Sequence, residues 1–430
     1  MHGRSVRRYI SAALSMSTLS ADVVESPAAG LESPCSPALP ERSKSEPVEQ
    51  ALPDTPPRPA WIEIDLGRLK QNFELINRDK PAGLQILSVV KDEAYGHGAL
   101  PVARTALACG VSFLALSTLE EAVTLRDQGV GARLLLLGDR EEKELPWCLD
   151  YDLTCCVSEP HTVAVLGQLA ARAGKRVAVH LKINTGMNRY GVRWNEAASL
   201  AALIGSTKSL LLEGMLSHFA QSDEVDKTFA LQQLARFEQA KRDIAGLGLA
   251  VKVKHLCNSG GFLDLPQAHF DMVRLGILPL GVFPSSVCRR IPGIEPVMTV
   301  KARIVAIQEL QPGDTVGYGM RYTASSRRRI AVLGLGYGDG FPRVRNQGCV
   351  LVHGQRCPLV GGVAMDAVTV DITGVPAAQL WDEAVVMGRQ GEDEISVHEV
   401  AKLKNSVSYD VLVSWRARLP KIYVNEAVAR

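Results

Sequence analysis

Residues 86–98 of this chain read ILSVVKDEAYGHG and join an apolar run to a polar loop. The first five residues are apolar or small and partly β-branched, which predicts a buried strand. The strand ends at Lys91. A lysine in this position packs poorly, but low-dielectric surroundings disfavour its charged form and leave an amine that can condense with an aldehyde. By position alone, a lysine that extends from the strand end to water is the commoner case.

Seven further apolar runs follow, spaced a few tens of residues apart and mostly separated by helical patterns. Together with 86–90 they cover residues 113–117, 133–138, 154–158, 177–183, 210–218, 251–258 and 272–281. Helices are predicted at 118–128, where Thr118 fits an N-cap, at 163–173 and at 227–245. Eight such units predict an α/β fold, a parallel (β/α)8 TIM-type barrel with its helices outside. A doubly wound open sheet is the alternative.

Two further regions flank the predicted barrel. After Pro292, alternating segments predict a mostly β domain with antiparallel connections. They are residues 298–307, 330–335, 350–353, 359–363, 368–372 and 383–387, followed by a helical stretch at 397–403. Residues 1–58 are rich in Ser and Pro and lack apolar periodicity, so we expect them to be disordered. The predicted division is an extension 1–58, a barrel domain 59–292 and a β-rich domain 293–430.

Composition limits the classes of function open to the chain. Of its 430 residues 46% are hydrophobic, enough for a large core, and the net charge of +2 gives no reason to expect a nucleic-acid partner. No apolar run approaches ~18 residues, so no membrane span is expected, and no metal-ligand motif occurs. The nine cysteines form no C-x-x-C pair and are expected to be reduced thiols of a cytoplasmic protein. The first twenty residues, basic and without an acid, leave a targeting role open.

Polar residues stand at the ends of several predicted strands. They are Lys91, Lys182, His218, Asn258, Ser259 and Arg274. Each has an ordinary structural explanation by itself, but a barrel would gather them around one mouth, where active sites of this fold lie. The small-residue turn at 258–261 suits a phosphate group, and Gly276 would let the backbone approach an anion. No Walker-type motif occurs, which argues against nucleotide binding.

A series of motifs follows in a fixed order and spacing from residue 61 to residue 423. It comprises Trp61-x-Glu63-x-Asp65-Leu66, Val89-Val90-Lys91-x-x-Ala94-Tyr95-Gly96-His97-Gly98, Leu181-Lys182-x-x-Thr185-Gly186-Met187-x-Arg189, Ser217-His218-Phe219, Asn258-Ser259, Arg274-x-Gly276, Gly317-Tyr318-Gly319, Gly336-Tyr337-x-Asp339-Gly340, Met365-Asp366 and Arg418-Leu419-Pro420-Lys421-Ile422-Tyr423. In order and spacing they resemble the motifs of the alanine racemases. The resemblance covers nearly the whole chain from Trp61 onward.

The resemblance implies the cofactor pyridoxal 5'-phosphate (PLP), carried by Lys91. The other cofactor-binding residues it implies are Tyr95, Arg189, His218, Asn258, Ser259, Arg274, Gly276, Ile277 and Tyr423. Arg189 would hold the phenolic oxygen of the cofactor and the substrate carboxylate, and Lys182, often carbamylated in the family, would position it. Arg274 would face the pyridine nitrogen and leave it unprotonated, which we expect to limit side reactions such as transamination.

The same resemblance implies a two-base racemisation of alanine, with D-alanine used in peptidoglycan synthesis. Lys91 would serve the D-alanine face and Tyr318 the L-alanine face. The phenol of free tyrosine has a pKa of about 10, so Tyr318 needs a positive field, which Arg274 would supply through His218. Met365 would lie near the substrate carboxylate. In the family this tyrosine and methionine reach the cofactor of the other subunit, so an obligate homodimer with shared sites is expected.

Four positions depart from the family pattern, and two alternative functions stay open. Asp92 and Glu93 stand close to Lys91, Asn188 replaces a usual glycine, Gly317 a common serine and Ala364 a frequent cysteine. These differences bear on substrate preference, so a broad-specificity or serine-preferring racemase is one alternative. The other is a non-catalytic PLP-binding homeostasis protein. Such a protein would be a barrel alone, which the β-rich domain and the tyrosine motif argue against.

Overall fold

The computed structural model describes Pro56 and residues 58–426. The predicted disordered extension therefore lies outside the described residues, apart from its last few positions. Arg58 is anchored: its Nη1 lies 2.6 Å from Oδ1 of the buried Asp339, and it donates to the carbonyl oxygens of Arg418 and Gly334. The described fold thus begins with an ion pair to the β-rich domain.

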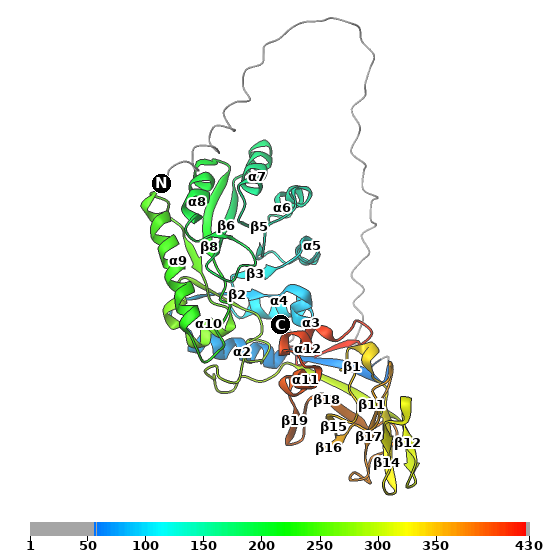
Figure 1. Cartoon of the computed structure of the whole chain (residues 1–430). Coiled ribbons are helices and arrows are strands. Elements are labelled where there is room, and N and C mark those ends of the chain that lie inside the picture. Colours follow the sequence, from blue (N-terminus) through cyan, green and yellow to red (C-terminus); the bar gives the residue numbers. More distant parts are fainter. Residues whose placement is uncertain (1–55, 57, 427–430) are drawn as a thin grey trace, which may run out of the picture. The chain divides into compact units, whose positions relative to one another are not determined.

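Eight parallel strands form the predicted barrel in the order β10-β2-β3-β4-β5-β6-β8-β9; Figure 1 labels β2, β3, β5, β6 and β8. They are β2 (Gln85–Val89), β3 (Phe113–Leu116), β4 (Arg133–Leu136), β5 (Thr154–Val157), β6 (Val177–Asn184), β8 (Leu210–Leu216), β9 (Val253–His255) and β10 (Met272–Leu275). Each of the eight apolar runs overlaps one strand, although the runs at 251–258 and 272–281 extend well beyond β9 and β10. Between β9 and β10, two backbone hydrogen bonds of 3.0 Å, from Asp271 N to Lys254 O and from Arg274 N to Cys257 O, nearly close the ring. The barrel prediction is confirmed.

Helices cover the outside of the barrel strands (Figure 1). They are α4 (Ala99–Ala108), α5 (Leu119–Asp127), α6 (Leu145–Asp150), α7 (Pro160–Arg172), α8 (Ala197–Ser206), α9 (Thr228–Gly246) and α10 (Ser259–Asp264). The short element α3 (Lys91–Gly96) lies between β2 and α4. The helices predicted at 118–128, 163–173 and 227–245 are α5, α7 and α9. Thr118 is the N-cap of α5: its hydroxyl accepts from Glu121 N at 3.3 Å, and the Glu121 carboxylate accepts from Thr118 N at 3.1 Å.

The place of an outer helix after β10 is taken by a helix that precedes β2 in the sequence. No α-helix directly follows β10 in the described chain; instead α2 (Leu66–Asp79), which precedes β2, carries Asn72, whose amide donates to the carbonyl oxygens of Pro279 and Glu295 at 3.0 and 2.8 Å. These bonds tie α2 to the segment after β10.

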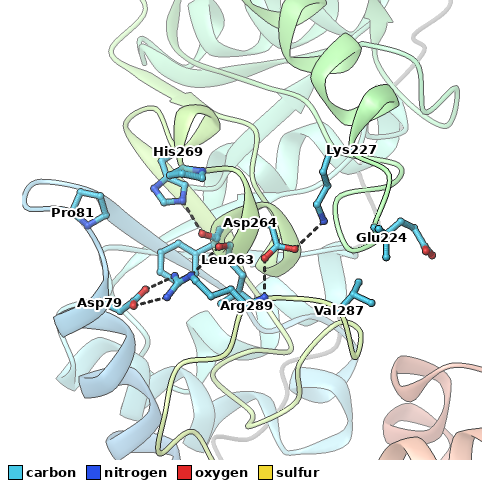
Figure 2. A pocket seen from close by; sticks show the side chains of 12 residues that line it. Asp79, Pro81, Glu224, Lys227, Leu263, Asp264, His269, Val287 and Arg289 are labelled. Carbon is cyan, nitrogen blue, oxygen red and sulfur yellow. Dashed lines mark hydrogen bonds and ion pairs between the residues drawn. The ribbon is translucent and has the colours of Figure 1, made fainter.

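A cavity of about 830 Å³ lies beside this junction, between the end of α2, α10 and the segment after β10 (Figure 2). Four of its charged side chains form two ion pairs. Arg289 holds Asp79 through two bonds of 2.8 and 2.7 Å, and Lys227 Nζ lies 2.8 Å from Asp264 Oδ2. These pairs join α2, α10 and the segment after β10 across the cavity, and Glu224 also lines it.

The β-rich domain is built on a second sheet, which also contains the first strand of the chain. Its strands are β1 (Ala60–Asp65), β11 (Met298–Leu310), β14 (Arg328–Leu333), β15 (Cys349–Val352), β16 (Gln355–Pro358), β17 (Val368–Asp371), β18 (Glu383–Gln390), β19 (Asp393–Ile395) and β20 (Lys421–Val424). β1 pairs antiparallel with β11 and parallel with β20. Although β1 falls within the predicted barrel range 59–292, it belongs to this sheet. The division at residue 292 stays a prediction.

Shorter elements complete the described chain. They are the strands β7 (Val192–Arg193), β12 (Thr315–Val316) and β13 (Tyr322–Thr323) and the helices α11 (Val397–Lys404) and α12 (Ser408–Ser414). The helix predicted at 397–403 is α11. The strand predicted at 359–363 is wrong: Leu359 and Gly362 make only isolated bridges, to Val370 and Arg345, because the chain turns between them at Gly361, whose φ is +77°. None of the described helices combines the length and apolar character needed to cross a bilayer.

Candidate active site

Lys91 is placed by an unusual turn at the carboxyl end of β2. The four residues 92–95 all have φ between +50° and +55°, so α3 is a left-handed turn. Such a conformation costs roughly 1–2 kcal/mol per L-residue. It is held by backbone bonds from Ala94 N to Val90 O at 3.0 Å and from Gly98 N to Glu93 O at 2.7 Å, and Ala94 is fully buried. Strain held by its surroundings in this way is typical of a functional site.

The charge of Lys91 is disfavoured by its surroundings. Burial lowers the pKa of its ammonium first, and the nearby guanidinium of Arg189 lowers it further, whereas Glu121 and Asp92 act in the opposite direction and do not prevail. The acidic neighbours noted in the sequence therefore do not restore an ordinary lysine. A larger share of Lys91 is a neutral amine near pH 7 than for a lysine in water.

Arg274 lies at the centre of the site and is 3% exposed. Its Nη2 donates to the carbonyl oxygens of Ser217 and Leu256 and to Nδ1 of His218, at 2.7, 2.9 and 3.0 Å. Its Nη1 donates to the carbonyl oxygen and to Nδ1 of His255, at 2.9 and 3.2 Å. Among the described residues no acceptor lies on its Nε–H, so this donor remains for a ligand atom.

The contact with Arg274 decides the state of His218. A guanidinium can only donate, so Nδ1 of His218 is the acceptor and its ring proton sits on Nε2. The pKa of His218 is held well below its usual range by burial first, and then by the cations Arg274, Lys182, Arg189 and Lys91. The strand ends predicted to meet at one mouth therefore do act on one another.

Small side chains and buried phenols form another part of the site. Asn258 is the N-cap of α10, with its Oδ1 accepting from Gly261 N at 2.9 Å. Next to it Ser259 is 3% exposed, and Ile277 is buried after β10. The ring of Tyr95 lies against Gly276, where a Cβ would come 2.5 Å from the phenol oxygen, so glycine is required there.

Two phenols of this region stay protonated at neutral pH. Burial, followed by Asp92, raises the pKa of Tyr95 to about 12, and burial, followed by Glu93, raises that of Tyr423 to about 12. The Tyr423 phenol lies against Gly98 in the loop after Lys91. Both are hydrogen-bond donors well suited to an anion.

Arg189 and Asn188 lie in the loop after β6 and are exposed. Asn188 has a φ of +56°, and its backbone and side chain both bond to the Asn184 side chain, at 3.1 and 3.0 Å. Asparagine tolerates the left-handed region better than most residues, which explains how it replaces glycine here.

Tyr318 and Met365 lie on the β-rich domain and are exposed. Their side chains are 82% and 52% accessible. Tyr318 begins a short 3₁₀ turn after Gly317, whose φ is +74°, and the Met365 carbonyl accepts from Gly338 N at 2.8 Å. Neither has a hydrogen bond to Lys91 of its own chain among the described contacts, so this chain does not bring its two predicted bases together.

Comparison with known proteins matches both parts of the chain. The model of the alanine racemase N-terminal domain covers residues 64–284, and that of the alanine racemase C-terminal domain covers residues 297–423. The chain belongs to the alanine racemase family. The alanine racemase of Syntrophobacter fumaroxidans is 39% identical over 356 residues, which are 83% of this chain and 95% of the relative. That of Halothermothrix orenii is 36% identical over 370 residues, 86% of this chain and 98% of the relative.

Solved structures of alanine racemases share the fold of this racemase. The enzyme of Streptomyces coelicolor A3(2) has a TM-score of 0.80 and 33% identity, covering 85% of this chain and 98% of the other. The enzyme of Bacillus anthracis with bound L-Ala-P has a TM-score of 0.79 and 30% identity, covering 86% and 96%. The predicted family and fold are thus confirmed. Both relatives and structures extend over the β-rich domain, which a barrel-only homeostasis protein would lack.

Sequence reasoning missed two side chains that contact site residues and hold them in place. His255 accepts from Arg274, and the ring of Tyr409 in α12 lies 6.2 Å from that of Tyr95. The signal for His255 was available: it stands three residues before Asn258 in a predicted strand, where a polar side chain pointing into a barrel needs a partner. Tyr409 carried no such signal, because its contact joins segments about 300 residues apart in sequence.

Proposed function

We propose that this racemase interconverts L-alanine and D-alanine with PLP carried by Lys91, and so supplies D-alanine for peptidoglycan. The observation that carries the proposal is a lysine amine of lowered pKa at a barrel strand end, at the same mouth as a buried arginine, Arg274, whose Nε–H has no acceptor among the described residues. A cytoplasmic location remains part of the proposal.

The donor set of the site fits PLP. Its two guanidinium groups, Arg189 and Arg274, match the negative charge of the cofactor, and the protonated phenols of Tyr95 and Tyr423 add neutral donors. Ser259 and Gly276 leave space for a close approach of backbone N–H groups. When bound, PLP supplies an electron sink for the charge left when the α-proton of the substrate departs.

Arg274 would set the electronic character of this sink. Each hydrogen bond that its guanidinium makes is to an acceptor, and a guanidinium does not give up its proton near neutral pH. A ring nitrogen placed against Nε–H accepts a hydrogen bond and stays unprotonated. We propose that this weakens the sink, which favours return of the proton to the α-carbon over transamination.

Two side chains would move the proton. The amine of Lys91 would remove or return it on the D-alanine face, and the phenol of Tyr318 would do so on the L-alanine face. Because the chain's own Tyr318 is 82% exposed, we propose that it enters the site of a second copy, together with Met365. The functional unit is then a homodimer with two shared sites.

We propose that Lys182 is carbamylated and positions Arg189. The pKa of Lys182 is lowered to about 7, by burial first and then by Arg274, so much of it is neutral amine near pH 7. A neutral amine attacks CO₂: the N–C bond forms and the nitrogen loses a proton. The resulting anion suits a region otherwise rich in cations.

The pH dependence of stability tests the state of Lys182. With a folded pKa of about 7 and an ordinary value of 10.5, the cofactor-free folded protein binds fewer protons than the unfolded chain between these values. Its unfolding free energy should therefore rise with pH through this window in CO₂-free buffer, by up to a few kcal/mol. Below pH 7 Lys182 is charged in the folded protein, and the full cost of burying its ammonium lowers the unfolding free energy. Lys182→Met should flatten the rise, as read from urea midpoints. Bicarbonate should stabilise the wild type and not the variant; equal responses would contradict carbamylation.

A spectrum and a chiral assay test the function as a whole. Purified protein incubated with PLP should turn yellow, and borohydride should remove the band and leave the cofactor attached at Lys91. L- and D-alanine should interconvert at matching rates, with serine and larger amino acids at least about tenfold slower, the discrimination a small apolar pocket can achieve. Faster turnover of serine would establish the serine-preferring alternative. A yellow protein without racemisation of any amino acid would establish the homeostasis alternative.

A further inference from the structure

A row of hydrogen-bonded side chains runs from Arg274 down the inside of the barrel. We call Arg274, His255, His180 and Glu213 the interior row. His255 Nε2 lies 2.9 Å from His180 Nδ1, and His180 Nε2 lies 3.4 Å from Glu213 Oε2. Both imidazoles are fully buried and Glu213 is 9% exposed. The Glu213 carboxylate is held by two N–H groups of Arg133, the first residue of β4, with Nη1 to Oε1 at 2.6 Å.

Only one assignment of donors and acceptors is possible along the interior row. Arg274 can only donate, so Nδ1 of His255 accepts and its proton sits on Nε2. That proton must be donated to Nδ1 of His180, which leaves the His180 proton on Nε2. The last proton is then donated to the Glu213 carboxylate, which can only accept. All three bonds therefore point from the mouth toward the amino end of the barrel.

The barrel wall makes room for this row. β8 pairs with β6 so that Gly214 stands beside His180, and a Cβ on Gly214 would come 2.6 Å from the imidazole Nδ1. The two imidazoles meet edge to face, with centroids 5.0 Å apart. Buried imidazoles are costly unless both nitrogens have partners, and here each of them does.

Glu213 is the charged end of the row. Burial favours its neutral form, but hydrogen bonds from His180 and Arg133 prevail and lower its pKa to about 2. The carboxylate therefore persists at any pH at which the protein functions. Burial, together with cations that include Arg133 and Arg274, likewise keeps His180 neutral.

We propose that Glu213 is a positioning residue: its carboxylate fixes which nitrogen of His180 and of His255 carries the proton, and so keeps an acceptor facing Arg274. Without it the row can reverse. A proton on Nδ1 of His180 would face the Nε2 proton of His255; if His255 also reversed, its Nδ1 proton would face the donors of Arg274. Either mismatch would shift the guanidinium of Arg274 away from the position in which it would face the ring nitrogen of the cofactor. The inference rests on the proposed function only in placing the cofactor against Arg274.

Three variants of the full-length protein separate positioning from stability. Glu213→Gln keeps a carbonyl acceptor for His180, Glu213→Leu keeps bulk without an acceptor, and Arg133→Met is the control that breaks the ion pair but leaves the carboxylate. Solid-state ¹⁵N NMR of histidine-labelled protein, with and without PLP, reports which ring nitrogen is protonated, and His255→Gln assigns its signal. The dissociation constant of PLP and the ratio of racemisation to transamination are measured alongside.

We expect the wild type, Glu213→Gln and Arg133→Met to hold His180 and His255 with the proton on Nε2. Glu213→Leu should show mixed states and bind PLP about tenfold more weakly, the effect of one lost hydrogen bond to a charged group. Arg133→Met should lower the unfolding midpoint without changing the tautomers. Suppose instead that in Glu213→Leu both histidines kept the proton on Nε2, the affinity for PLP was unchanged and only stability was lost. Glu213 would then be a structural ion-pair partner and the proposal would be wrong. A protein that bound no PLP would refute the proposed function, whereas the tautomer result would stand.

Discussion

Replacing Lys91 by alanine should abolish the yellow colour with PLP and lower the rate of racemisation by about 10⁴-fold or more. The loss reaches the upper end of the range for one general base, because the same amine also holds the cofactor covalently. Its site is prepared for both tasks, since burial and Arg189 lower the pKa of the amine. The measurements are the absorbance spectrum, the mass of the borohydride-treated protein and the rate in a chiral assay.

Lys91→Arg is the matched control for charge. It keeps a cation at the strand end, but a guanidinium does not become a neutral amine near pH 7. Both variants should therefore be inactive, and added methylamine should restore part of the activity of Lys91→Ala only, since a small amine can occupy the vacated space. Covalent retention of PLP by Lys91→Ala would show that another lysine carries the cofactor.

The barrel could be predicted because each of its strands can be recognised from a short stretch of sequence. Each of the eight barrel strands lies in a short apolar run, mostly between helical patterns, and β8, for instance, is buried along nearly its whole length. Because parallel strands are covered on both faces, such runs stand out in a sequence. The placing of Lys91, Lys182 and Arg274 at one mouth then follows from the fold.

The remaining features could not be predicted because they depend on distant partners. The left-handed turn at 92–95 has no glycine within it, and it exists because the packing around Ala94 and Tyr95 holds it. β1 reads as an ordinary first strand, yet it pairs with β11 and β20, more than 230 residues away. The interior row from Arg274 to Glu213 joins four strands, β10, β9, β6 and β8, and no spacing within one strand reveals it.

Tyr318→Phe should lower racemisation by roughly 10²–10⁴-fold in both directions, the range for loss of one general base. The two enantiomers of alanine have equal free energies, so the overall rates must fall together, and the asymmetry appears only in hydrogen exchange. In heavy water the variant should still exchange the α-hydrogen of D-alanine, which faces Lys91, and should not exchange that of L-alanine. Retained exchange with both enantiomers would show that Tyr318 is not the second base.

Mixing variants tests whether Tyr318 acts on the partner's site. When Lys91→Ala and Tyr318→Phe chains form dimers at random, half of the dimers contain one chain of each kind. If the sites are shared between subunits, each such hybrid has one site with both defects and one site with neither. Co-expression should then restore about a quarter of the wild-type activity, although each parent is inactive. If each chain instead used its own tyrosine, every site in the mixture would carry one defect and no activity would return. The 82% exposure of Tyr318 in the isolated chain favours the first outcome.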